Sequence, residues 1–373
     1  MTSRTGAVLV LEDGRTFHGE SFGGLGQTFG EAVFTTAMTG YQEVLTDPSC
    51  HRQIVTMTAA HVGNTGVNEA DAESERVWAS GVVIRQPSPI VSSWRAKQSL
   101  ESHLAEAGVV GICGVDTRAL TRHLRTAGAM RAGIASTGLD PQALLDEVRR
   151  VPKMKGASLT DEVTTSRAYR LEADGAKRFT VAVLDLGVKR NSLRSLTKRG
   201  LELWVMPARS GVEEILATGA DAVFVSNGPG DPAAADTQVE TIRQLLQRRV
   251  ATFGICMGHQ LLARALGLST YKLDFGHRGV NQPVKDLDSG AVAITSHNHG
   301  FAVSSPHSTA FDTPFGAARV THRCLNDDVL EGLACEEVPA FSVQFHPESA
   351  AGTHDADYLF ERLVDMMEGQ ADA

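Results

Sequence analysis

The chain has 373 residues, and at roughly 100–200 residues per domain this length favours two domains. Hydrophobic residues make up 42% and charged residues 21%, an ordinary globular composition that excludes a largely disordered chain. The 44 acidic residues outnumber the 35 basic ones, so non-specific binding to nucleic acid is not expected.

Two further features bear on the compartment. The longest aliphatic stretch near the start, residues 7–11, is too short for a membrane span or a signal peptide. The five cysteines include no CxxC pair, which fits a reducing compartment and argues against a disulfide framework or a zinc ribbon. The sequence therefore predicts a cytoplasmic enzyme of two domains, with no metal site and no membrane contact.

The first half of the chain favours short strands followed by helices. Asp13-Gly14 predicts a hairpin turn. The expected strands are residues 7–11, 16–21, 32–36, 53–58, 81–85 and 109–115. Asp116 or Thr117 is a candidate cap for a helix through Arg125, with Gly128 just beyond its end, and Asp140 caps the next helix. Without a repeating βα rhythm, residues 1–151 are interpreted as an α+β domain and the polar residues 152–178 as a connector.

Strands and helices alternate in the second half, residues 179–373. The expected strands are 179–185, 203–206, 222–225 and 251–255, and the expected helices are 189–199, 212–217, 236–248 and 258–266. This alternation predicts an α/β domain with a doubly wound parallel sheet. Ligands bind at the carboxyl ends of such strands, which directs attention to the loops after Val225 and Ile255.

The second of these loops contains a candidate nucleophile. In residues 253–260 (FGICMGHQ), Cys256 lies between a strand and a helix, with Gly254 and Gly258 on either side. Small neighbours permit the tight turn of a nucleophile elbow, and the following helix N-terminus favours a negatively charged sulfur. A buried structural cysteine is the usual alternative, and we adopt that interpretation for the other four cysteines.

A cysteine nucleophile needs a base and a group that orients the base. His346 ends an apolar run, which predicts a position at a strand end, and Glu348 follows two residues later. Taken alone, this could equally be a His-Pro turn with a solvated glutamate. Together with the cysteine elbow, it favours a Cys256–His346–Glu348 triad.

The loop after Val225 is rich in turn residues, and as such could be only a turn. Its two glycines and two prolines, in residues 226–232 (SNGPGDP), could also present a backbone N–H to an oxyanion, with the Met257 N–H as a second donor. No GxxxxGK[ST] motif is present, so nothing here favours a nucleotide.

These three motifs together resemble the class I (triad) glutamine amidotransferases. Further stretches are similar to the small chain of carbamoyl-phosphate synthase: residues 38–49, 61–66, 115–118, 162–165, 275–284 and 298–303. The resemblance covers nearly the whole chain. It implies an N-terminal small-chain domain, and that domain separates this family from the glutaminases of other amidotransferases.

The resemblance also implies roles for individual residues. Cys256 attacks the side-chain amide of glutamine, His346 moves the proton, and the oxyanion lies between the N–H groups of Gly230 and Met257. The residues that hold glutamine are implied to be Ser49, Gly228, Gln260, Asn298, Gly300 and Phe301, which would place the site at the domain interface. Without the resemblance, Asn298 and Gly300 could be an ordinary turn, and Gln260 a solvated helix residue.

A large-chain partner is implied as well. It receives the ammonia through a tunnel and makes carbamoyl phosphate from bicarbonate and two ATP, for arginine and pyrimidine synthesis. ATP, magnesium and potassium are expected on that partner and no cofactor on this chain, with the two chains forming a heterodimer. The alternatives are a glutaminase of another amidotransferase, a stand-alone γ-glutamyl hydrolase and a non-catalytic, glutamine-binding regulatory subunit.

The sequence departs from the family pattern at a few positions. Met257 replaces the usual leucine, and its implied role uses only the backbone. His297 occupies a position where many relatives have glutamine, and Ala350-Ala351 replaces a more usual Ser/Pro pair.

Overall fold

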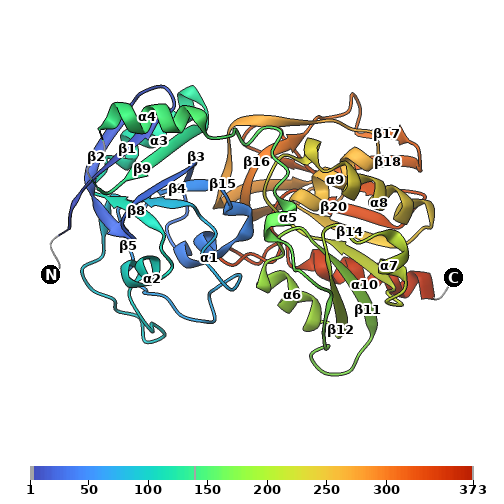
Figure 1. Cartoon of the computed structure of the whole chain (residues 1–373). Helices are drawn as coiled ribbons and strands as arrows, with labels where there is room; N and C mark the ends of the chain where they lie inside the picture. Colours follow the sequence, from blue (N-terminus) through green and yellow to red (C-terminus); the bar gives the residue numbers. More distant parts are fainter. Residues whose placement is uncertain (1–3, 138–139, 372–373) are drawn as a thin grey trace. The chain divides into compact units, whose positions relative to one another are not determined.

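The computed structural model describes residues 4–137 and 140–371 (Figure 1). The chain divides into two compact units. Unit 1 contains Met1–Met154 and Asp274–Gly279, and unit 2 contains Lys155–Leu273 and Val280–Ala373.

Unit 1 is built on a closed barrel with the strand order β1-β2-β8-β6-β4-β3-β9. These strands are β1 (Gly6–Leu11), β2 (Thr16–Gly23), β3 (Gln27–Thr35), β4 (Gln53–Met57), β6 (Gly81–Val83), β8 (Val110–Cys113) and β9 (Met130–Ala135). Strands β5 (His61–Val62) and β7 (Gln86–Pro87) form a separate parallel pair. The antiparallel β1–β2 hairpin confirms the expected turn. Strand β9 was not expected from the sequence, yet it closes the barrel by pairing with both β1 and β3.

The helices of unit 1 include two that start at capping residues predicted from the sequence. They are α1 (Tyr41–Thr46), the 3-10 helix η1 (Pro48–Cys50), α2 (Leu100–Glu106), α3 (Thr117–Ala127) and α4 (Pro141–Arg150). The Asp116 side chain accepts a hydrogen bond from the Ala119 N–H (3.0 Å), and α3 ends at Gly128, whose φ of 91° suits only glycine well. Asp140 caps α4 in the same way, so both predicted helix starts are confirmed.

Unit 2 contains an eleven-stranded sheet with the order β10-β12-β11-β13-β14-β20-β19-β16-β15-β18-β17. The strands are β10 (Tyr169–Leu171), β11 (Phe179–Asp185), β12 (Leu201–Pro207), β13 (Ala222–Val225), β14 (Ala251–Ile255), β15 (Thr270–Asp286), β16 (Val292–Val303), β17 (Ala310–Thr313), β18 (Gly316–Cys324), β19 (Leu330–Cys335) and β20 (Ala340–Val343). The five strands from β12 to β20 are parallel, which confirms the doubly wound sheet. The antiparallel extension beyond β20 was not expected.

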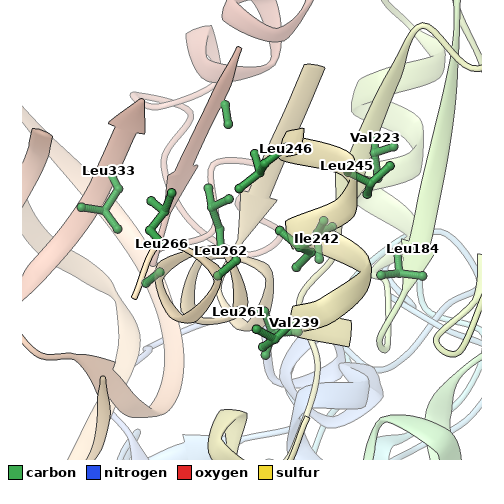
Figure 2. Close-up of a cluster of buried hydrophobic side chains, with 14 of the residues drawn as sticks. Leu184, Val223, Val239, Ile242, Leu245, Leu246, Leu261, Leu262, Leu266 and Leu333 are labelled. Carbon is green, nitrogen blue, oxygen red and sulfur yellow. The ribbon is translucent and has the colours of Figure 1, made fainter. Parts of the chain in front are cut away.

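Helices cover both faces of this sheet. They are α5 (Thr160–Val163), α6 (Arg190–Thr197), α7 (Val212–Leu216), η2 (Pro232–Ala234), α8 (Asp236–Gln247), α9 (Met257–Ala265) and α10 (Tyr358–Ala371). Helices α7, α8 and α9 pack on one face, where Figure 2 shows Leu245 of α8 beside Val223 and the leucines of α9 on the other side of α8. Helices α6 and α10 pack on the other face, against Val183, Phe224 and Phe253. Consecutive strand residues such as Val183 and Leu184 point to opposite faces, and each fully buried leucine contributes about 1.5–3 kcal/mol.

This topology brings four loops to one edge of the sheet. Strands β11, β13, β14 and β20 run in the same direction, so the segments that follow their carboxyl ends are neighbours. These segments contain Lys189, residues 226–232, Cys256 and His346. Within the described ranges, none of the helices has the length and apolar character that a bilayer span requires.

Candidate active site

Cys256 lies at a strained turn between β14 and α9. Its backbone has φ 55° and ψ −104°, a conformation that costs a non-glycine residue about 1–3 kcal/mol. A Cβ at Gly258 would lie 2.1 Å from the Val225 carbonyl oxygen, and one at Gly254 would lie 2.7 Å from the Gly258 carbonyl oxygen. The two glycines are therefore required because α9 packs directly against β13 and β14.

The sulfur of Cys256 lies at the N-terminus of α9. The Cys256 N–H donates to the Val343 carbonyl (2.9 Å), which ties the turn to β20. The thiol lies 4.0 Å from the Asn298 carbonyl oxygen, and the side chain is almost fully buried. The Met257 N–H donates to no other group in the described part of the chain. The partial positive charge of this helix end favours negative charge on the sulfur.

His346 and Glu348 form a buried pair beyond the end of β20. His346 Nδ1 lies 2.8 Å from Glu348 Oε1, and the His346 N–H donates to the Ser296 carbonyl (2.8 Å). Strand β20 ends at Val343, so His346 lies three residues past the strand rather than at its last position. His346 Nε2 is buried and makes no hydrogen bond of normal geometry within the described residues.

Lys189 supplies a positive charge to this pair. Its Nζ lies 3.1 Å from Glu348 Oε1 and also donates to the carbonyls of Ser349 (2.9 Å) and Ala350 (3.3 Å). The side chains of Lys189 and Glu348 are 5% and 0% exposed, so both charges are removed from water.

The charges in this cluster shift the pKa values in opposite directions. Burial by itself lowers the pKa of His346, but the charges of Glu348 and Cys256 outweigh it and raise this pKa to about 10. Burial raises the pKa of Glu348, but Lys189 and His346 outweigh it and lower this pKa to about 2. A negatively charged Glu348 therefore stabilises a positively charged His346, with Nε2 as the nitrogen that can exchange a proton.

The loop between β13 and η2 lies beside the cysteine turn. The Gly258 N–H donates to the Ser226 carbonyl (3.0 Å), which joins this loop to α9. A Cβ at Gly228 would lie 2.1 Å from the Leu186 carbonyl oxygen, so only glycine fits there. Gly230 has φ 101°, and its N–H donates to no group among the residues that the structure describes.

Gln260 belongs to a buried amide network. Its Nε2 donates to the Phe301 carbonyl (2.8 Å) and to Gln344 Oε1 (3.0 Å), and its side chain is 3% exposed. The interpretation of Gln260 as a solvated helix residue is therefore wrong. Asn298, Gly300 and Phe301 lie in β16, so the first two do not form a turn either.

Ser49 lies in unit 1. It is the middle residue of η1, where it is buried and its N–H donates to Asp47 Oδ1 (2.9 Å). The structure brings the other implied residues together in unit 2, around the cysteine turn.

Three further buried side chains of unit 2 offer metal-ligating atoms. His297 Nδ1 lies 3.1 Å from His299 Nε2 and 3.8 Å from Glu331 Oε2. Imidazole nitrogens and carboxylates bind transition metals. The same groups already have internal partners, because His299 Nδ1 donates to the Phe301 carbonyl (2.8 Å) and His297 Nε2 pairs with Thr295 Oγ1 (2.7 Å).

Lys189 and Gln344 were not predicted from the sequence to belong to the site. Lys189 follows the first parallel strand, β11, and its residue type and position at the carboxyl end of a strand could have identified it. Gln344 gives no such signal, since its role as the acceptor for Gln260 depends on a contact across 84 residues of sequence.

Comparisons with known proteins agree with these two units. Residues 9–134 match the CPSase domain of the carbamoyl-phosphate synthase small chain, and residues 182–366 match the class-I glutamine amidotransferases. The chain is 58% identical over 366 residues to the carbamoyl phosphate synthase small chain of Streptomyces avermitilis, covering 98% of this chain and 96% of that one. The small chain of Streptomyces coelicolor is 57% identical (98% and 97% covered), and that of Mycolicibacterium paratuberculosis is 54% identical (97% and 98% covered).

Proposed function

This chain belongs to the carbamoyl phosphate synthase small chains, the glutamine-hydrolysing subunits of that enzyme, and we propose that Cys256, His346 and Glu348 carry out the hydrolysis. The observation that carries the proposal is the strained turn that presents Cys256 in the same buried cluster as the His346–Glu348 pair. The match of residues 9–134 to the small-chain domain favours this role over the glutaminase of another amidotransferase.

The reaction follows from the positions of these groups. The proton of the Cys256 thiol is held on His346 Nε2, because Nδ1 is engaged by Glu348, and Sγ attacks the side-chain amide carbon of glutamine. The imidazolium then gives that proton to the leaving nitrogen, and ammonia departs as the γ-glutamyl thioester forms. Water gives a proton to His346 Nε2 as it hydrolyses the thioester to glutamate, which releases the Cys256 sulfur and restores the charged His346. Glu348, charged and held by Lys189, stabilises the imidazolium at each stage.

The tetrahedral intermediates carry a negative oxygen that needs donors. The N–H groups of Gly230 and Met257 are the two candidates, since neither donates elsewhere in the described part of the chain. Removing one such donor from an oxyanion site typically costs about 10²–10³ in kcat. Ser49, Gly228, Gln260, Asn298, Gly300 and Phe301 are proposed to hold the rest of the glutamine molecule.

Membership of this family supports a proposal for the partner. The large chain, in a heterodimer with this one, takes the ammonia to make carbamoyl phosphate, and ATP, magnesium and potassium bind on that partner. A shielded path for ammonia prevents its protonation in bulk water. The odd number of scattered cysteines, with no CxxC pair, favours a reducing compartment and so the cytoplasm.

Glutamate release from glutamine, with and without the large chain, tests the proposal. Wild type is expected to be active and stimulated by the large chain, and Cys256→Ser is expected to lose at least about 10³-fold in kcat. Cys335→Ser, which changes another cysteine of unit 2, is the matched control and should keep full activity. Full activity in Cys256→Ser would refute the triad. A wild type that stays inactive with the large chain would instead support a non-catalytic, glutamine-binding subunit.

A further inference from the structure

The segment of residues 156–159 lies directly on the proposed oxyanion loop. The Asp231 N–H donates to the Ala157 carbonyl (2.9 Å), and the Gly156 N–H donates to Asp231 Oδ2 (2.8 Å). Between these two hydrogen bonds, Ser158 pairs with Gly230 in an isolated antiparallel bridge. Every one of these contacts lies within unit 2.

This pairing leaves Gly230 little freedom to move. A Cβ at Gly230 would lie 2.7 Å from the Ala157 carbonyl oxygen and 3.2 Å from the Leu159 nitrogen, so the two backbones are in close contact. The hydrogen bonds of the bridge use the Asp231 N–H and not the Gly230 N–H. The segment 156–159 therefore fixes the backbone of Gly230 while leaving its N–H available to a ligand.

The Asp231 carboxylate joins the two sides of this arrangement. Oδ2 accepts from Gly156, and Oδ1 accepts from the Ala233 N–H (2.9 Å) at the start of η2. The residue is 6% exposed, so these charge-assisted bonds are largely shielded from water. One side chain thus sets the position of the segment 156–159 relative to the turn that follows Gly230.

The segment is itself anchored to the sheet a few residues later. The Thr165 N–H donates to Asp185 Oδ2 (2.7 Å), and Thr164 Oγ1 accepts from the Ala208 N–H (2.9 Å). Leu159 and Thr160 are buried, and they lie between the bridge at Ser158 and these anchoring hydrogen bonds. The chain from residue 156 to residue 165 is therefore held to unit 2 at both of its ends.

We propose that Asp231 is a positioning residue for glutamine hydrolysis: with the segment 156–159, it aims the Gly230 N–H at the oxyanion. The inference rests on the proposed function, since it needs Gly230 to act as an oxyanion donor. An oxyanion donor stabilises the intermediate only if it is fixed before the charge develops. Loss of the Asp231 bonds therefore lowers kcat, while the ground-state binding of glutamine and the chemistry of the Cys256 sulfur are preserved.

The test uses Asp231→Ala and Gly156→Ala in the full small chain, assayed for glutamate release in the presence of the large chain. Asp231→Ala removes both side-chain bonds. Gly156→Ala changes the partner of Asp231 in the segment 156–159. Gly156 has φ 82°, which an alanine rarely adopts, and an added Cβ meets no atom within 4 Å, so the substitution disturbs only the backbone conformation. The matched control is Asp221→Ala, which removes an aspartate bond to the Thr180 N–H (2.8 Å) at the opposite end of β11.

We expect kcat to fall at least about tenfold in Asp231→Ala and about threefold in Gly156→Ala. KM should change less than about threefold, and the rate at which iodoacetamide alkylates Cys256 should match wild type, since alkylation forms no oxyanion. Asp221→Ala should keep its kcat. If Asp231→Ala fails to fold, Gly156→Ala carries the test.

Two results would overturn the inference alone: an unchanged kcat in the folded variants, or an alkylation rate that falls in parallel with kcat. The second would show that the cysteine turn itself is disturbed. A wild type that releases no glutamate with the large chain would overturn the proposed function and this inference with it. The activity of wild type in the same assay therefore separates the two failures.

Discussion

Replacing Lys189 by methionine is expected to destabilise unit 2 strongly. Lys189 Nζ and Glu348 Oε1 are 3.1 Å apart, with side chains 5% and 0% exposed, so the variant leaves a buried carboxylate without its lysine partner. Breaking a buried pair by removing one partner typically costs about 3–5 kcal/mol. Because His346 still faces Glu348, we expect the lower end, about 3 kcal/mol.

Hydrogen–deuterium exchange of β14 peptides at increasing urea measures the free energy of unfolding of unit 2. The double variant Lys189→Met/Glu348→Gln should be less destabilised than the sum of the single changes, because it removes both buried charges. The control is Arg248→Met, which breaks an ion pair between two exposed side chains, Arg248 (42% exposed) and Glu213 (76% exposed). This variant should change the free energy of unfolding only a little. A Lys189→Met variant as stable as this control would refute the argument.

The pH dependence gives an independent check. The pKa of Glu348 is lowered to about 2 in the folded chain, against an ordinary value of 4.5. Its contribution to stability is therefore complete above about pH 4.5 and is lost as the pH falls towards 2. The difference in unfolding free energy between wild type and Lys189→Met should accordingly shrink below about pH 4.5. A difference that stays constant down to pH 3 would show that lost packing, and not charge, causes the effect.

Three further changes test other parts of unit 2. Gly258→Ala forces a Cβ to 2.1 Å from the Val225 carbonyl oxygen, so thermal unfolding should show that the free energy of unfolding falls by about 1–3 kcal/mol or more. Gln260→Leu leaves Gln344 Oε1 without its donor, so we expect the free energy of unfolding to fall by about 1–3 kcal/mol. The KM for glutamine should also rise, and an unchanged KM would contradict the proposed binding role of Gln260. Burial lowers the pKa of His259 to about 3, against an ordinary value of 6.5. The unfolded chain therefore binds a proton at His259 more readily than the folded chain, and the free energy of unfolding falls as the pH drops below 6.5, by up to about 2 kcal/mol at pH 5. His259→Gln should remove this pH dependence of the unfolding free energy, which urea titrations above pH 6.5 and at pH 5 would measure.

The sequence determined the elements whose signals are local. Asp116 and Gly128 mark the ends of α3 because capping and left-handed geometry depend on one or two residues. The alternation of aliphatic strands and amphipathic helices determined the parallel sheet, and the spacing of Gly254, Cys256 and Gly258 determined the turn at the candidate nucleophile. Each of these depends on steric rules that act within a few residues.

The tertiary structure alone decided which distant segments meet. The barrel of unit 1 closes through β9, whose short sequence with Gly133 has little strand preference of its own and is held by pairing with β1 and β3. The sheet of unit 2 continues past β20 because β19 pairs with it, and β16, β15, β18 and β17 follow in that order. No local sequence pattern specifies which of these strands become neighbours.

The same distinction applies within the site. His346 and Glu348 are two residues apart, and their pairing could be predicted, whereas Lys189 reaches Glu348 across 159 residues. Similarly, the bridge between Ser158 and Gly230 joins segments that are far apart in the sequence. Sequence patterns report the conformational preferences of neighbouring residues, but a buried charge pair or a backbone bridge between remote segments depends on the packing of the whole unit.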